Sequence, residues 1–196
     1  MEIREDILEA DYLYHIFNRG INSNLIFLDN ENMSFFLKKT EQYVLPFFVI
    51  YGYCLMPNHF HFILRPKSNV EISSKINTSI KGLHCEESIY SKSLARLFSS
   101  YTQAFNKVYR RSGPLLESPF KRIRVTSEEY LRNLIIYIHQ NPEDFQNYKF
   151  SSYKAVISNV ETSISRNEIL AIFDNKENFK ICHQKKIDSS LFEIKI

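Results

Sequence analysis

Apolar residues follow two periods along this chain, and the shorter period predicts its strands. Strand-forming residues fill positions 12–18, and the apolar stretch 47–64 is broken only by Met56-Pro57-Asn58. Proline followed by asparagine is typical of a turn, so this stretch predicts two antiparallel strands joined tightly. Both strands are expected to be central in a sheet, and a short further strand is expected around 122–125.

The longer, helical period predicts two amphipathic helices in the first two thirds of the chain. The first is capped by Asp29 or Asn30, and the second begins at Leu94 and ends before a Gly-Pro pair. Residues 67–93 are polar and weakly patterned, so we expect a mobile connection with short helical pieces there.

A third helix is expected to open at a capping box formed by Thr126 and Glu129 and to run to about Gln140. Beyond position 150 the pattern weakens to one short helix that begins at Ser165-x-x-Glu168. The order strand, helix, strand, strand, helix, strand, helix predicts an α+β fold, a ferredoxin-like antiparallel sheet with helices packed on one face.

Composition excludes several classes of protein. With 44% hydrophobic residues the chain of 196 can bury a core, and its four glycines include no GxGxxG or GxxxxGK[ST] phosphate loop. Three cysteines without a CxxC pair predict reduced thiols. The acidic N-terminus is not a signal peptide, and no apolar run reaches the ~20 residues of a membrane helix. We therefore expect a cytoplasmic protein.

Positive charge gathers in one part of the chain although the net charge is only +3. Six basic residues lie between Lys107 and Arg124, against the single acid Glu117. No basic amphipathic helix with an apolar face accompanies them, so the stretch favours a polyanion over a membrane as partner.

Two histidines are placed to share one ligand. His59 and His61 lie two positions apart in the second strand of the predicted hairpin, so both side chains point to one face and Phe60 to the other. Two imidazoles on one face can bind one divalent cation. Most HxH pairs are solvated histidines on a sheet, so the pattern alone is weak.

Tyr137 and Asn141 bring a phenol and an amide to one face of the third helix, because they lie four positions apart. Each also has a structural interpretation. Tyr137 continues the packing stripe of Tyr130 and Leu134, and Asn141 ends a helix before Pro142. The residues alone leave both interpretations open.

Taken together, these motifs resemble the single-tyrosine HUH transposases, and among them the REP-associated tyrosine transposase-like proteins. The resemblance rests on Pro57-Asn58-His59-Phe60-His61, the basic stretch, and Tyr137-Ile-His-Gln-Asn141-Pro142, in that order. Three shorter motifs agree with it, namely Tyr14-His15-Ile-Phe-Asn-Arg19-Gly20, Gly113-Pro-Leu-Leu and Ser151-Ser152-Tyr153. It spans about residues 10 to 155.

The resemblance implies a transposase that cleaves and rejoins single-stranded DNA, often with a hairpin, through a 5′-phosphotyrosine intermediate and a Mg²⁺ or Mn²⁺ ion. His59 and His61 match the metal-ligand histidines, and Tyr137 matches the nucleophile. Asn141 matches the third ligand, with Gln140 as an alternative that helical geometry mildly disfavours. We expect Arg110, Arg111, Lys121, Arg122 and Arg124 to contact the DNA backbone, with Arg19 as a further candidate. Tyr101, Tyr109 and Phe120 are candidates for base stacking, with packing on the apolar stripe of its helix as the alternative for Tyr101.

The same reasoning divides the chain into a catalytic domain, 1–155, and a C-terminal helical extension, 156–196. We expect a monomer or a homodimer, with the tyrosine supplied in cis or in trans. His15, His84 and His183 are interpreted as structural.

Two other functions compete with this prediction. A nucleotidyl hydrolase of the HIT type would need a third alternating histidine, but position 63 is Ile. A domesticated, non-catalytic protein that binds DNA hairpins stays open as the alternative.

Overall fold

The computed structural model describes residues 7–73, 86–188 and 192. In chain order, the elements are β1 (Tyr14–Arg19), the 3-10 turn η1 (Ile21–Ser23), α1 (Asn30–Tyr43), β2 (Phe48–Met56), β3 (His59–Pro66), α2 (Asn69–Ser73), α3 (Glu86–Val108), β4 (Lys121–Arg124), α4 (Glu128–His139), α5 (Tyr153–Ile157), α6 (Arg166–Ile172) and α7 (Lys176–Gln184).

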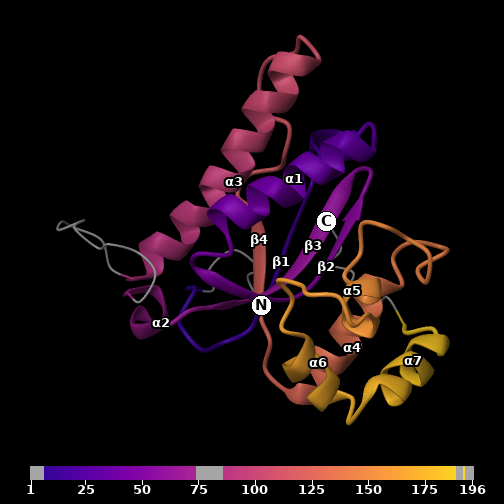
Figure 1. Cartoon of the computed structure of the whole chain (residues 1–196). Helices are drawn as coiled ribbons and strands as arrows, with labels where there is room; N and C mark the ends of the chain where they lie inside the picture. The colour runs from indigo at the N-terminus through magenta and orange to yellow at the C-terminus, as the bar shows by residue number, and fades with distance from the viewer. Residues whose placement is uncertain (1–6, 74–85, 189–191, 193–196) are drawn as a thin grey trace.

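Four strands form one antiparallel sheet in the order β2-β3-β1-β4. The units β1-α1-β2 and β3-α3-β4 interleave, because each unit's two strands enclose one strand of the other. This arrangement is the ferredoxin-like α+β fold that the order of elements predicts, and Figure 1 shows α1 and α3 lying together over the sheet.

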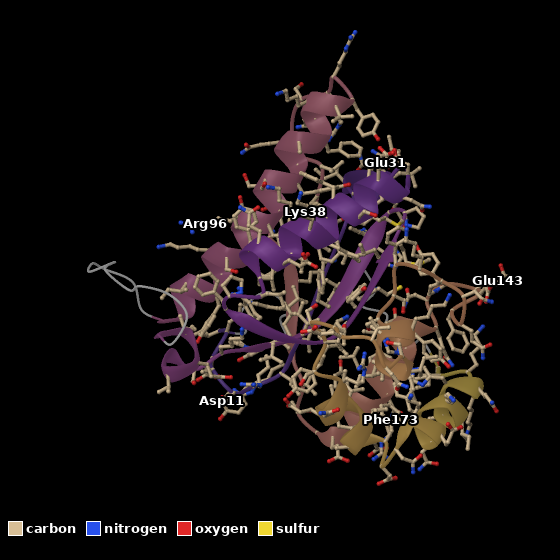
Figure 2. The ribbon with its side chains drawn as sticks, in the orientation of Figure 1. Asp11, Glu31, Lys38, Arg96, Glu143 and Phe173 are labelled. Carbon is tan, nitrogen blue, oxygen red and sulfur yellow. The ribbon has the colours of Figure 1, made fainter. Side chains whose placement is uncertain are left out.

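Alternation along β3 decides what each face of the sheet contacts. Phe60 packs against Phe36 of α1 and Phe98 of α3, with ring centroids 5.1 and 5.4 Å away. These two helices therefore cover one face, as predicted, whereas α4, the third predicted helix, lies on the other face. The outer surface of α1 and α3 carries exposed charges such as Lys38 and Arg96 (Figure 2). The odd-numbered residues of β3, His59 and His61 among them, point to the opposite face.

Helix α4 lies against that opposite face, and a glycine allows it to come close. A Cβ atom on Gly52 of β2 would lie 3.0 Å from Cδ1 of Ile138 in α4 and 3.7 Å from Cδ1 of Ile63 in β3. A side chain at position 52 would therefore crowd Ile138, which would have to shift to make room for it.

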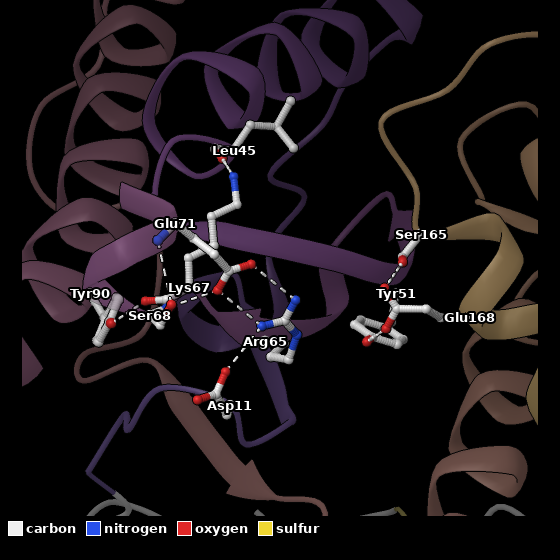
Figure 3. Close-up of polar contacts among 10 residues, drawn as sticks. All are labelled: Asp11, Leu45, Tyr51, Arg65, Lys67, Ser68, Glu71, Tyr90, Ser165 and Glu168. Atoms are coloured by element: carbon white, nitrogen blue, oxygen red, sulfur yellow. Dashed lines mark hydrogen bonds and ion pairs between the residues drawn. The ribbon is translucent and has the colours of Figure 1, made fainter. Parts of the chain in front are cut away.

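Polar side chains of β2 and β3 contact the segment before β1, helix α2 and helix α6 (Figure 3). Arg65 of β3 forms ion pairs with Asp11 at 3.4 Å and Glu71 at 3.3 Å. The Tyr51 hydroxyl of β2 donates a short hydrogen bond to Glu168 of α6. Burial, and then the Glu168 carboxylate, raise the pKa of Tyr51 to about 12, so this phenol stays protonated and serves as a donor.

Two details of the predicted strands and helices are wrong. Strand β2 is an edge strand and not a central one, but its edge is covered by bridges to Ser151 and Ile164, which explains its apolar sequence. The cap of α4 is Ser127, whose hydroxyl accepts from the backbone of Tyr130, and not Thr126. Two neighbouring hydroxyl residues can each cap a helix, and only the backbone geometry separates them.

Other boundaries also differ from the expected ones. Helix α3 begins at Glu86, before the predicted Leu94, and α2 lies within 67–93; positions 74–85 are outside the described residues. The helix α7 was not predicted. The division into domains at 155, a position within α5, stays a prediction.

The expected cysteine and membrane properties can be checked in the described part of the chain. There, Cys54 and Cys182 are free thiols. None of the helices in this part combines the length and apolar character that crossing a bilayer requires.

Candidate active site

His59 is held between two side-chain amides. Its Nδ1 lies 2.7 Å from Oδ1 of Asn58, and its Nε2 lies 3.2 Å from Oδ1 of Asn141. The Asn141 amide is oriented by a hydrogen bond from its Nδ2 to the backbone oxygen of Tyr137, at 3.0 Å, so that Oδ1 points at the imidazole. Both ring nitrogens therefore face oxygen atoms.

A neutral imidazole has only one N–H with which to satisfy two oxygens. Burial is the main cause that lowers the pKa of His59, so the ring favours its neutral form. With the proton on Nδ1, directed at Asn58, the Nε2 lone pair and the Asn141 oxygen face each other across 3.2 Å. Two such acceptors directed at one point are what a bound cation requires.

His61 lies beside His59 and is more deeply buried, with 7% of its surface exposed. Their ring centroids are 5.1 Å apart. Nδ1 of His61 lies 2.9 Å from Nε2 of His15, which leaves the His61 Nε2 as the ring nitrogen available to the cavity. Burial, followed by the charges of His15 and His59, holds the pKa of His61 well below its ordinary value. The neutral ring is the form that binds metals.

Tyr137 approaches the histidine pair from α4. Its ring meets His61 edge-on at 5.7 Å between centroids and stacks on Phe192 at 4.9 Å. His59, His61, Tyr137 and Phe192 line one cavity of about 210 Å³. The two imidazoles of β3 and the phenol of α4 thus line the same cavity.

Positively charged side chains also line this cavity, one of them directly across from His59 in the neighbouring strand. Arg19 of β1 and Lys121 of β4 line it, and Glu117 lies between them, 2.5 Å from Arg19 Nε and 3.6 Å from Lys121 Nζ. Two cationic side chains thus lie beside the histidine pair. Side chains of this charge are suited to contact a phosphate group.

The other predicted DNA contacts lie elsewhere. Arg122 and Arg124 alternate with Lys121 along β4 and point to the α3 side of the sheet, where Arg122 contacts Ser91 at 3.3 Å. Arg110 and Arg111 follow the C-terminal end of α3, and both are exposed. The basic stretch is therefore divided among three places, and it does not form one surface.

The aromatic residues expected to stack bases are largely committed to the fold. Tyr101 is 2% exposed, and its hydroxyl donates to the backbone oxygen of Ile26 at 2.6 Å, so the prediction that it stacks a base is wrong. The Tyr109 hydroxyl bonds Asp29 at 3.0 Å, and Phe120 packs on Phe98.

The two neighbouring amides after α4 have different partners. Gln140 donates to the backbone oxygens of His183 at 2.8 Å and Lys185 at 3.0 Å, and its Oε1 accepts from the amide of Ile187 at 3.2 Å. The Gln140 side chain is thus occupied by the C-terminal segment, and Asn141 is the amide beside His59.

The histidine before these amides belongs to the core. His139 lies between Nε2 of His183 and the hydroxyl of Ser152, at 2.9 and 2.7 Å, and is fully buried. It ties α4 to α7. His84, also interpreted as structural, is outside the described residues.

Four residues of this site were not expected from the sequence: Asn58, which orients His59; His15, which contacts His61; Glu117; and Phe192. Asn58 adjoins the HxH pair and could have been noticed. His15 could not, because strand alternation gives its face but not its register against β3.

The nitrogen and oxygen atoms of His59, His61 and Asn141 are compatible with a divalent ion that accepts both kinds of ligand. Within the described residues, no group of three His, Cys, Asp or Glu side chains could hold a metal. Two imidazole nitrogens and one amide oxygen make a site that is soft for Mg²⁺, which prefers oxygen ligands, and more suitable for Mn²⁺.

Comparison with known proteins supports the fold. No protein-family model and no curated protein matches this chain. Among solved structures, it is similar to a REP-associated tyrosine transposase bound to a REP hairpin, with a TM-score of 0.57 over 81% of this chain and 87% of the other. The two chains share a fold. Their sequences are 12% identical, and a similarity at this level shows a common fold and nothing more about function.

Proposed function

We propose that this protein is a transposase-like enzyme that cleaves and rejoins single-stranded DNA next to a hairpin, with Tyr137 as the nucleophile. The observation that supports this most directly is that His59, His61 and Tyr137 line one cavity together with two cationic side chains. The structurally similar transposase is bound to a REP hairpin, and a DNA hairpin as the partner of this protein is consistent with the positive charge of Arg19 and Lys121 at the cavity.

His59, His61 and Asn141 would hold a Mg²⁺ or Mn²⁺ ion. A bound divalent ion neutralises the charge on a phosphate oxygen and orients the phosphate for attack. The chain's own residues prepare this site: Asn58 orients His59, and the backbone of Tyr137 orients Asn141. Arg19 and Lys121 would contact the backbone phosphates that flank the scissile bond.

In the proposed reaction the Tyr137 oxygen attacks phosphorus, and the bond from phosphorus to the 3′ oxygen breaks. The phenol loses its proton, the leaving oxygen gains one, and the products are a 5′-phosphotyrosine and a free 3′-OH. The phosphotyrosine preserves the energy of the broken linkage, so another 3′-OH can reverse the step without ATP.

The experiment is to incubate the protein with single-stranded hairpin DNA labelled at its 3′ end and Mn²⁺, and to look for a labelled adduct that survives denaturation. We expect an adduct with the natural sequence and none with Tyr137→Phe. Tyr130→Phe is the matched control, because Tyr130 lies on the same helix and its ring also packs on Phe192. It should form the adduct normally.

Two results would count against this function. An adduct that persists in Tyr137→Phe would contradict the nucleophile. Tight hairpin binding with no adduct under any divalent ion would favour the alternative, a non-catalytic hairpin-binding protein.

A further inference from the structure

His15 is a buried histidine in contact with His61, one of the candidate metal ligands. It lies on β1, is 1% exposed, and pairs across the sheet with Ile63 on one side and Ile123 on the other. Its ring stacks on those of Phe17 and His61, at 4.6 and 5.1 Å between centroids, and these two rings also stack on each other at 5.8 Å. Its one polar contact in the described structure joins its Nε2 to Nδ1 of His61, at 2.9 Å.

One proton must lie between these two rings. A neutral imidazole has a single N–H, and the 2.9 Å contact joins the two ring nitrogens directly, so only one of them can carry a proton there. Either His15 donates from Nε2, and the proton of His61 then lies on Nε2, or His61 donates from Nδ1 and its Nε2 has a free lone pair. Only the second arrangement lets His61 bind a metal.

The other nitrogen of His15 shows that this contact has a cost. Nδ1 of His15 is buried and has no hydrogen-bond partner. A buried polar atom without a partner is destabilising, and an apolar residue would fill this place in the core without that loss. Packing alone therefore does not explain a histidine at position 15.

The two candidate ligand histidines have equivalent support. Asn58 lies at Nδ1 of His59, and His15 lies at Nδ1 of His61. Metal-binding histidines usually donate the N–H of their second nitrogen to such a partner, which fixes the tautomer and the ring orientation.

We propose that His15 is a positioning residue that accepts the Nδ1 proton of His61 and so keeps the His61 Nε2 lone pair directed at a metal ion in the cavity. This inference rests on the proposed function, because it needs His61 to be a ligand. It adds a residue that acts on the metal only through another side chain.

The first test measures Mn²⁺ binding to the full chain by electron paramagnetic resonance, without DNA. In His15→Phe the Nδ1 proton of His61 has no acceptor, and we expect affinity to fall by about 10–100-fold. His15→Gln keeps an acceptor oxygen and should recover much of the loss. The control is Ile123→Ala, which removes packing beside His15 but no hydrogen bond and should bind Mn²⁺ normally.

These results separate the inference from the proposed function. If the natural sequence binds no Mn²⁺, the metal site fails and the role of His15 fails with it. If the natural sequence binds Mn²⁺, His59→Ala abolishes binding and His15→Phe binds normally, only the role of His15 is overturned.

A second test needs no variant and so does not depend on whether His15→Phe folds. In ¹⁵N-histidine-labelled protein saturated with diamagnetic Mg²⁺, long-range ¹H–¹⁵N spectra report which nitrogens are protonated. We expect the proton of His61 on Nδ1 and an unprotonated Nε2 on His15. A proton on Nε2 of His61 would overturn the inference.

Discussion

Adjacent amides after α4 give the sharpest test of the candidate ligand set. Gln140 and Asn141 differ by one methylene, and sequence alone leaves either as third ligand. In the structure, Oδ1 of Asn141 lies 3.2 Å from Nε2 of His59, while Gln140 bonds the C-terminal segment. Substituting each by alanine should therefore affect different properties of the protein.

The size of each effect follows from the hydrogen bonds that each substitution removes. Gln140→Ala removes three hydrogen bonds to backbone atoms, each worth about 0.5–1.5 kcal/mol, and partial exposure reduces their total to about 2 kcal/mol. In a chain of this length that lowers the melting temperature by roughly 4–8 °C. Asn141→Ala loses only its bond to the Tyr137 backbone, about 1 kcal/mol, together with the metal-facing oxygen.

Calorimetry and a Mn²⁺ titration, performed on the same samples, separate the two residues. Gln140→Ala should melt earlier and bind Mn²⁺ normally. Asn141→Ala should keep most of its stability but bind Mn²⁺ at least about tenfold more weakly. Removing a residue that only supports a metal ligand already costs about 10–100-fold in affinity, so removing a ligand itself should cost no less. The opposite pattern, with Gln140→Ala weakening Mn²⁺ binding and Asn141→Ala leaving it intact, would refute this ligand set.

Three further predictions concern the fold around the site. Gly52→Val should destabilise the protein by about 1–3 kcal/mol and reduce adduct formation, because its side chain crowds Ile138 of α4. In a double-mutant cycle Ile138→Ala should recover part of that stability, and additive effects would contradict the close contact. Tyr101→Phe should cost about 1 kcal/mol without weakening hairpin binding; weaker binding at unchanged stability would restore Tyr101 as a DNA contact. Burial lowers the pKa of His15 to about 3 and that of His183 to about 4. Below pH 6.5 these two histidines therefore bind protons in the unfolded chain but stay neutral in the folded chain. The free energy of unfolding, measured with urea, should thus be constant above about pH 7.5 and fall from pH 6.5 toward pH 4, by about 1.4 kcal/mol per pH unit for each histidine, whereas a constant value over that range would contradict their burial as neutral rings.

Local patterns predicted the architecture because each depends on neighbouring residues only. The turn at Pro57-Asn58 and the alternation at His59 and His61 are properties of one hairpin, and both are present in the structure. The cap of α4 was misplaced by one residue, because Thr126 and Ser127 have the same chemistry and only the folded backbone selects between them.

Long-range geometry explains what sequence could not supply. The contact between His15 and His61 depends on the register of β1 against β3, which no local pattern encodes. The sequence does show, by contrast, that Lys121 and Arg122 cannot belong to one DNA-binding surface. Successive strand residues point to opposite faces, so a basic run within β4 could not form a single surface.

The central claim is that His59, His61 and Asn141 surround one cation next to the Tyr137 phenol. Anomalous diffraction from crystals soaked in Mn²⁺ tests it most directly. The account predicts one strong peak within coordination distance of Nε2 of His59, Nε2 of His61 and Oδ1 of Asn141. Saturating Mn²⁺ with no peak between the two imidazoles, or with the only peak on carboxylates such as Glu117, would contradict it.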